Sequence, residues 1–289
     1  MKVAFIGLGN MGYPMAGHWA QKGFDVTVFN RTTSKAQAWV KDYGGNYQRT
    51  PAKAVQGAEC VALCVGRDDD VRQVMLGRNG ILAGVTPGTY ILDHTTTSCE
   101  LAQEMAQRAQ KVGAIYMDIP VSGGQAGAQN GVLTAFVGGT PRDYEAIQKY
   151  VGAYCAKTRL IGPVGQAQLA KMVNQICIVS IIQGLSEALA FGMREGLPME
   201  KVVKAMEGGA AGSWQMSNRA YTMLEGRYDF GFAVDWMRKD LGICLERAKK
   251  NGANLHNTQE IDQFYARVQA LGGGRWDTSS LIERLKRKD

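Results

Sequence analysis

Histidine is scarce in this chain, and the cysteines lack the spacing of a metal site. Three histidines in 289 residues argue against a histidine-rich metal centre. The cysteine spacings do not resemble those of a zinc site. Three of the six cysteines lie in apolar stretches: Cys60, Cys64 and Cys177. We expect them to be free thiols in the core of a protein from a reducing compartment. We therefore expect no metal ion.

Long apolar runs are missing as well. No run of about 18 uncharged apolar residues is found, so we expect no membrane span and no membrane partner. The start, Met1–Asn10, is apolar but lacks the basic region and the cleavage site of a secretion signal. These absences favour the cytoplasm.

The net charge is +7, but the positive residues do not form one block. Their densest run, Arg284 to Lys288, is typical of a solvated helix end. A phosphate-rich cofactor is a sufficient reason for part of the excess. We expect no nucleic-acid partner, apart from a weak effect of this basic tail.

Short apolar strands alternate with helices over the first 160 residues or so, which predicts an α/β fold with a doubly wound parallel sheet of the Rossmann type. Predicted strands cover 2–6, 25–29, 60–65, 89–93, 114–118, 133–137 and 158–161. Predicted helices cover 14–22, 34–43, 71–76 and 100–112.

The pattern changes near Gly162 and Pro163, after which only helices are predicted. A long helical pattern covers 167–194, interrupted at Gly184, and further helices cover 200–207, 235–250 and 258–270. We therefore predict two domains. Residues 1–163 form the NAD(P)-binding domain, and residues 164–289 form an all-helical substrate and oligomerisation domain behind a long connecting helix.

The first motif is Gly7-Leu8-Gly9-Asn10-Met11-Gly12 between a strand and a helix. Gly7 permits the tight turn, Gly9 admits a pyrophosphate, and Gly12 allows close packing of helix and strand. The motif alone is a weak signal, but here it lies in a strand–helix–strand unit of about 30 residues. All six residues are predicted to bind a dinucleotide.

The second strand ends at Asn30-Arg31-Thr32. An NAD-specific site usually has an acid there, whereas neutral Asn30 does not repel a 2′-phosphate and Arg31 can pair with one. We predict that NADP(H) is preferred and NAD(H) possible; the alternative is that Arg31 is an ordinary surface residue. Val65 and Thr96, at later strand ends, are predicted near the nicotinamide side, with a helix-capping role for Thr96 or Thr97 equally open.

Ser122-Gly123-Gly124 follows another strand, and its amides and hydroxyl can converge on a substrate carboxylate. The alternative is a flexible turn. Lys171 and Asn174 share one helix face with Gln175. In a cleft between domains, Lys171 can exchange a proton with an alcohol while hydride leaves the same carbon. Taken alone, Lys171 is more often a solvated residue.

Together these residues resemble the β-hydroxyacid dehydrogenases, which include 3-hydroxyisobutyrate dehydrogenase, tartronate semialdehyde reductase and glyoxylate/succinic semialdehyde reductases. The resemblance covers nearly the whole chain. Its anchors are Phe5–Gly12 with Pro14-Met15, Asp118–Gly124, Gly165–Asn174 and Lys239-Asp240-Leu241. Phe29–Lys35 looks most like the NADPH-using members.

The resemblance implies hydride transfer between a nicotinamide cofactor and a small 3-hydroxy acid or its semialdehyde. It implies that Lys171 is the acid–base, that Asn174 supports it, and that Ser122, Gly123 and Gly124 bind the substrate carboxylate. It also implies that Thr96 and Lys239 touch the cofactor.

Some features leave alternatives open. Trp214 is expected to face the substrate, or else to pack in the core. Imine reduction is an alternative, although relatives with that activity typically carry Asp or Tyr in place of Lys171. A non-catalytic NADP-binding protein is another. Apolar helical faces such as 176–185 predict a homodimer or homotetramer.

Overall fold

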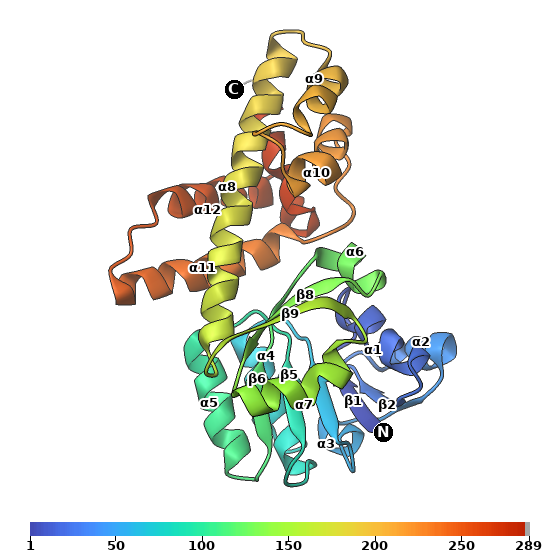
Figure 1. Cartoon of the computed structure of the whole chain (residues 1–289). Coiled ribbons are helices and arrows are strands. Elements are labelled where there is room, and N and C mark those ends of the chain that lie inside the picture. The colour runs from blue at the N-terminus through green and yellow to red at the C-terminus, as the bar shows by residue number, and fades with distance from the viewer. Residues whose placement is uncertain (287–289) are drawn as a thin grey trace. The chain divides into compact units, whose positions relative to one another are not determined.

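The structure is a computed structural model that describes residues 1–286 of the chain (Figure 1). Its contacts divide the chain into two compact units, Met1–Lys171 and Met172–Asp289. The first unit contains the sheet and the second is helical. The expected α/β fold class, with a Rossmann-like N-terminal region and a helical C-terminal region, is confirmed.

The first unit is built on one mixed sheet whose strand order is β3-β2-β1-β4-β5-β6-β8-β7, with β9 paired to β8. The order reverses at β1, so the loops that follow β1 and β4 diverge from a switch point, where ligands of such sheets bind. The strands are β1 Lys2–Ile6, β2 Asp25–Phe29, β3 Asn46–Tyr47, β4 Cys60–Leu63, β5 Tyr90–Asp93, β6 Ile115–Asp118, β7 Val121–Ser122, β8 Leu133–Gly138 and β9 Cys155–Gly162.

The sheet is parallel from β3 to β6 but not at its other edge. Strand β8 runs antiparallel to β6 and β7 and parallel to β9. The expectation of a wholly parallel sheet is therefore wrong at this edge. The physical reason is the connection of residues 123–132 between β7 and β8, which is shorter than the dozen or more residues that a parallel crossover needs.

Helices cover both faces of this sheet because successive strand residues point to opposite sides. In β1, Phe5 lies in one apolar cluster with Trp19 and Trp39, whereas Ile6 lies in the other with Met75. The first cluster includes α1 Gly12–Gln21, α2 Thr33–Tyr43 and α7 Pro141–Val151. The second includes α3 Pro51–Ala54, α4 Asp68–Leu76 and α5 Cys99–Gln110.

The longest helix, α8 Gln166–Arg194, begins in the first unit and continues unbroken into the second (Figure 1). Gly184 was expected to interrupt it but lies within it, with open space where a side chain would stand. The other helices are α9 Met199–Met206, α10 Trp214–Glu225, α11 Val234–Asn251, α12 His256–Ala270 and α13 Glu283–Lys286.

Helix α10 was not predicted from the sequence. The hydroxyl of Ser213 caps its start by accepting from the Met216 amide at 3.0 Å. Gly226, with φ of 72°, ends it in the left-handed conformation that glycine adopts most easily.

Helix α8 is also long and apolar enough to cross a membrane by length and composition. By length and composition alone, this helix therefore departs from the expectation that the chain has no membrane-spanning segment. The core helix of a soluble protein meets the same criterion. Within the second unit, Val179 and Ile182 of α8 are buried in one apolar cluster, and Leu185 and Leu189 in another.

Two further expectations need correction. All six cysteines are free, but Cys177 is exposed on α8 instead of lying in the core. The basic residues near the C-terminus are not simply solvated: the Arg284 guanidinium lies 3.7 Å from the Phe264 ring centroid, and Lys286 Nζ lies 2.9 Å from Glu283 Oε1. Lys288 lies outside the described residues.

Two buried titratable groups meet at the end of β5. Asp93 accepts from the Thr95 amide at 2.8 Å and from the Tyr116 hydroxyl at 2.7 Å, and burial raises its pKa to about 6. His94 Nδ1 lies 2.8 Å from the Ile119 carbonyl oxygen, which can only accept, so Nδ1 carries the hydrogen and Nε2 accepts from Tyr154. Burial lowers the pKa of His94 to about 4.

These two shifts predict opposite pH dependences. Lowering the pH from 6.5 to 4 destabilises the folded chain through His94, because the unfolded chain binds that proton more readily. Raising the pH from 4 to 6 destabilises it through Asp93, because the folded chain holds that proton more tightly. Each effect amounts to roughly 3 kcal/mol, so in the native chain they largely cancel.

Single variants should separate the two effects in urea unfolding at pH 4.5 and 6.5. Relative to the native chain, Asp93→Asn should gain stability as the pH rises, and His94→Gln should gain stability as it falls. Parallel pH profiles for both variants and the native chain would contradict this account.

Candidate active site

The glycine loop after β1 lies against the loop after β4. Gly7 has φ of 96°, and a Cβ there would lie 2.3 Å from the Cys64 carbonyl oxygen. A Cβ on Gly12 would lie 2.0 Å from the Gly7 carbonyl oxygen. These two glycines are therefore required by close packing of protein on protein.

Gly9 differs from its neighbours in the motif. A Cβ there would meet no atom of the protein within 4 Å, so the loop leaves open space at the position where the motif admits a pyrophosphate. Met11, the residue before α1, makes no side-chain capping bond, and exposed Asn10 precedes it. A phosphate is the kind of acceptor that such a helix start accommodates, so these residues fit a dinucleotide.

Asn30 holds the glycine loop from the end of β2. Its Oδ1 accepts from the Leu8 amide at 2.9 Å, and its Nδ2 donates to the Thr32 carbonyl at 3.0 Å. The position that carries an acid in NAD-specific sites is thus occupied by a neutral side chain whose amide is already committed to backbone.

Arg31 is largely exposed, and its Nη1 lies 3.7 Å from Asp70 Oδ1 in the first turn of α4. Thr32 precedes α2 without a side-chain capping bond. An anion near Arg31 would therefore meet a guanidinium and a helix start, but also a competing carboxylate.

The loops after β4 and β5 are tied together by hydrogen bonds. The Val65 amide donates to Thr95 Oγ1 at 3.1 Å. The Ser98 amide donates to Asp68 Oδ1 at 3.1 Å. Ser98 also caps α5 by accepting from the Leu101 amide, so the capping role left open for Thr96 or Thr97 belongs to Ser98.

The start of α8 is bound to the carboxyl end of β6. Asp118, the last residue of that strand, accepts from the Gly165 amide at 2.8 Å and from the Gln168 amide at 3.0 Å. Burial raises the pKa of Asp118, and these backbone donors oppose the increase. Lys171 follows one turn later, and it is only 7% exposed. Lys171 is therefore a buried residue and not the solvated helix residue of the alternative.

Ser122, Gly123 and Gly124 form the connection between β7 and α6 Gly124–Gln129. Ser122 is half-buried and pairs with Thr134 of β8. Gly123 and Gly124 have φ of 125° and 60°, a conformation that other residues rarely adopt. The loop thus has a defined backbone shape anchored to the sheet.

In the second unit, Asn174 and Lys239 belong to one chain of polar contacts. Asn174 Nδ2 donates to Gln175 Oε1 at 2.8 Å, and Gln175 Nε2 donates to Asp240 Oδ2 at 2.6 Å. Lys239 Nζ lies 2.9 Å from Asp240 Oδ1, and Asp240 is buried. Asp240 was not among the predicted site residues, although its neighbour Lys239 pointed to this segment.

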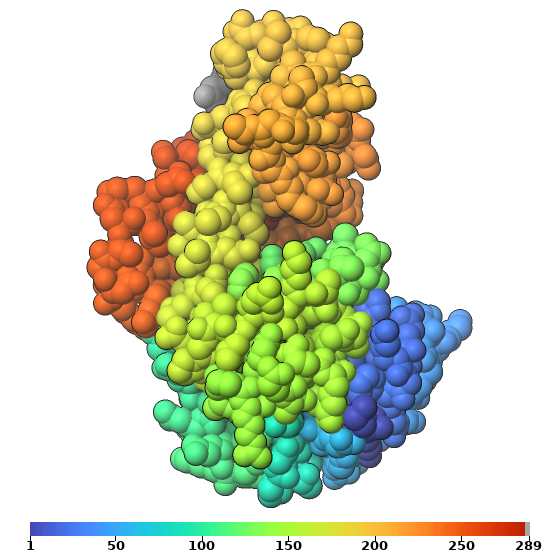
Figure 2. Space-filling model, viewed as in Figure 1, coloured from blue at the N-terminus to red at the C-terminus, as the bar shows by residue number. Residues whose placement is uncertain are grey.

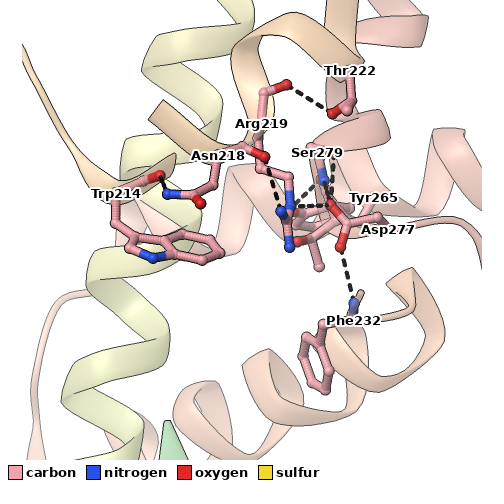
Figure 3. Close-up of polar contacts among 9 residues, drawn as sticks. Trp214, Asn218, Arg219, Thr222, Phe232, Tyr265, Asp277 and Ser279 are labelled. Atoms are coloured by element: carbon pink, nitrogen blue, oxygen red, sulfur yellow. Dashed lines mark hydrogen bonds and ion pairs between the residues drawn. The ribbon is translucent and has the colours of Figure 1, made fainter. Parts of the chain in front are cut away.

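Trp214 stands at the first position of α10 and is 53% exposed, so it is not a core residue. Figure 3 shows its indole beside Arg219, whose guanidinium carbon lies 4.9 Å from the ring centroid. Arg219 Nε in turn donates to buried Asp277 at 3.2 Å. The indole is therefore held against Arg219, while about half of Trp214 remains exposed.

Sequence reasoning missed two residues that organise the first unit. Asp118 and Gln168 lie inside motifs that the sequence had singled out, but neither was predicted to have a role. No local signal identifies them, because their partners lie 47 or more residues away. Among residues 1–286, no group of three or more His, Cys, Asp or Glu side chains could hold a metal ion.

Comparison with protein families matches both parts of the chain. Residues 2–162 match the NAD-binding domain of 6-phosphogluconate dehydrogenase. Residues 165–285 match the NAD-binding domain of NADP-dependent 3-hydroxyisobutyrate dehydrogenase. Together these two models cover nearly all of the sequence.

Individual relatives agree over their full length. An uncharacterized oxidoreductase of Shewanella frigidimarina is 53% identical over 99% of this chain and 98% of its own. The 2-hydroxy-3-oxopropionate reductase of Escherichia coli is 30% identical over 99% and 97%.

Solved structures show the same fold. The 3-hydroxyisobutyrate dehydrogenase of Mycobacterium tuberculosis, solved with L-serine, has a TM-score of 0.88 at 25% identity and covers 99% of both chains. An imine reductase of Streptomyces aurantiacus is more distant, with a TM-score of 0.63 at 21% identity over 99% of this chain and 100% of its own.

The glycine loop yields a test with an internal control. Gly9→Ala should retain the fold, because the new Cβ meets no protein atom, but should weaken dinucleotide binding by at least about 10-fold by occupying the open space. Gly12→Ala should instead destabilise the chain, because its Cβ overlaps the Gly7 carbonyl. Thermal unfolding and cofactor fluorescence titration measure the two effects. Unchanged cofactor affinity in Gly9→Ala would show that this loop is not the cradle.

Proposed function

Because this chain belongs to the β-hydroxyacid dehydrogenase family, we propose that it interconverts a small 3-hydroxy acid and its semialdehyde with a nicotinamide dinucleotide. The observation that carries the proposal is the buried Lys171 side chain, one helical turn after a helix start that Asp118 binds to the sheet. Burial restricts the motion of the flexible lysine side chain, and an acid–base group must be held in a fixed position.

In the proposed reaction, the glycine loop Gly7–Gly12 would hold a reduced nicotinamide dinucleotide, which would supply the hydride for the carbonyl carbon of the semialdehyde. The Lys171 ammonium donates its proton to the carbonyl oxygen, which becomes the hydroxyl, and the amine regains a proton from water. In the reverse direction the neutral amine accepts the hydroxyl proton. Asn174, three residues later on the same helix, is proposed to support Lys171.

The substrate carboxylate is proposed to bind at Ser122, Gly123 and Gly124. The glycines of this loop support that role, because glycine-rich turns can present backbone amides to an anion. Val65 and Thr96 are proposed to contact the nicotinamide side. Lys239 is proposed to touch the cofactor, as the family resemblance implies. Trp214, which is exposed, is proposed to face the substrate.

Lys171→Ala should lower turnover by at least about 100-fold, because the proton-transfer step loses its donor. Cofactor affinity should stay within a few-fold, since the residue is not part of the glycine loop. Lys201→Ala, on the exposed side of α9, is the control and should be unaffected. The assay follows NADPH oxidation with tartronate semialdehyde and succinic semialdehyde.

Three results would contradict the proposal. Near-normal turnover in Lys171→Ala would remove the acid–base role. Reduction of a cyclic imine in preference to every semialdehyde would support imine reduction. Cofactor binding without turnover of any substrate would support the non-catalytic alternative.

We further propose that NADP(H) is preferred, with NAD(H) accepted. Three observations support this: neutral Asn30 at the strand end, exposed Arg31 beside it, and the start of α2 immediately after. A 2′-phosphate there would gain charge-assisted hydrogen bonds from the guanidinium.

Arg31→Ala should weaken NADPH binding by about 10-fold or more and leave NADH binding nearly unchanged. Asp70→Asn should strengthen NADPH binding by about 2- to 5-fold, because it removes the carboxylate that competes with the 2′-phosphate for Arg31. The effect should be small, since an ion pair near the surface contributes little free energy. Asp69→Asn, whose carboxylate contacts Arg72 instead, is the matched control. Fluorescence titration with both cofactors measures these effects, and equal losses for NADH and NADPH would refute the 2′-phosphate role.

A homodimer or homotetramer in the cytoplasm completes the proposal. Side chains of α8 reach the surface on the face shown in Figure 2, where this helix is yellow. Much of the predicted face 176–185 is buried within the second unit, including Val179, Ile182 and Leu185. The exposed apolar residues of this helix that support an interface are Val173, Ile181 and Phe191. The six free cysteines support a reducing compartment. Light scattering on the purified chain measures its mass, and the mass of a monomer would refute the proposed homodimer or homotetramer.

A further inference from the structure

Gln168 joins the start of α8 to the loop after β5 through both ends of its amide. Its Oε1 accepts from the Thr97 amide at 3.0 Å, and its Nε2 donates to the Thr95 carbonyl oxygen at 2.8 Å. The side chain is completely buried. Gln168 therefore binds the backbone on both sides of Thr96, the residue between its two partners.

The backbone of the same residue is fixed as well. The Gln168 amide donates to Asp118 Oδ2 at 3.0 Å, so one residue binds β6 and the β5–α5 loop at once. Lys171 follows three residues later, and residues three apart lie on the same face of a helix. Gln168 thus lies between two groups of the proposed site, Thr96 on the cofactor side and Lys171 on the proton-transfer side.

An amide is well suited to this position because it both donates and accepts. A methionine of similar length would leave the Thr97 amide and the Thr95 carbonyl unpaired in a buried place. An ionised glutamate could accept from Thr97 but could not donate to Thr95. A protonated glutamate could do both.

We propose that Gln168 is a positioning residue that sets the separation between Thr96 and Lys171. The proposal rests on the function proposed above. Gln168 has no ionisable group and acts only through its two neighbours. Because displacement of a reacting group by about 1 Å can cost about 100-fold in rate, a loosened loop or helix start should reduce turnover without preventing cofactor binding.

The test compares Gln168→Met with the native chain and with Gln166→Leu, a control at the exposed first position of the same helix. Gln168→Met should lower kcat by about 10- to 100-fold, with the Kd for NADPH within about 3-fold. The primary isotope effect with NADPH deuterated at nicotinamide C4 should rise, because hydride transfer becomes more fully rate-limiting. Gln166→Leu should change none of these quantities.

Gln168→Glu provides a second readout, should the methionine variant fold poorly. Burial should raise the pKa of the new carboxyl. Its kcat relative to the native chain should therefore increase as the pH falls, when the protonated carboxyl regains the bond to Thr95. Merely structural damage would give no such recovery in a chain shown by circular dichroism to be folded throughout.

Two results would overturn the positioning role alone, provided that the native chain is active. One is a folded Gln168→Met variant whose kcat is within 2-fold of the native value. The other is a Gln168→Glu variant whose kcat relative to the native chain does not change with pH. A native chain that turns over no semialdehyde overturns the proposed function, and the positioning role with it. The two failures are therefore distinguishable in one set of assays.

Discussion

The carboxylate of Asp118 is the constraint on which the first unit of this protein depends. It closes β6 and receives two backbone amides from the start of α8. Burial makes ionisation of this group costly, and the amide donors offset that cost only if the helix begins at this place. The start of α8 is therefore bound to the carboxyl end of β6 by this buried group.

Several loops at the carboxyl edge of the sheet depend on that arrangement. With the start of α8 bound to Asp118, the Gln168 side chain reaches the β5–α5 loop. The Thr95 hydroxyl of that loop accepts in turn from the Val65 amide after β4. The glycine loop touches the same β4 segment at Cys64. The candidate site of the first unit is thus held by a continuous set of short contacts between loops, which is the kind of support that a site needs if its groups are to keep their separation.

The second unit uses the same physical device around a different carboxylate. Asp240 is buried, and it binds Gln175 of α8 and Lys239 of its own helix. Asn174 joins this set through Gln175. A buried charge with these partners is costly to disturb, so the orientation of Asn174 on α8 is coupled to the position of α11.

Much of this protein was determined by the sequence alone. The glycine loop, most strands of the first unit and the long helix follow from patterns within about 30 residues, because strand alternation, helical periodicity and the steric needs of glycine are local properties. The family was indicated by a resemblance whose motifs are spread over nearly the whole chain. Gly7 and Gly12 were predicted from their motif, and the structure leaves no room for a Cβ at either position.

Only the tertiary structure decided the antiparallel edge at β8, the exposure of Cys177, and the roles of Asp118, Gln168 and Asp240 as anchors. Local patterns report which residues prefer burial, but they do not report which distant group each one meets. Gln168 and Thr95 are 73 residues apart in the chain. Their hydrogen bond exists only because the helix and the strand ends are packed together, and that packing is a property of the whole folded unit.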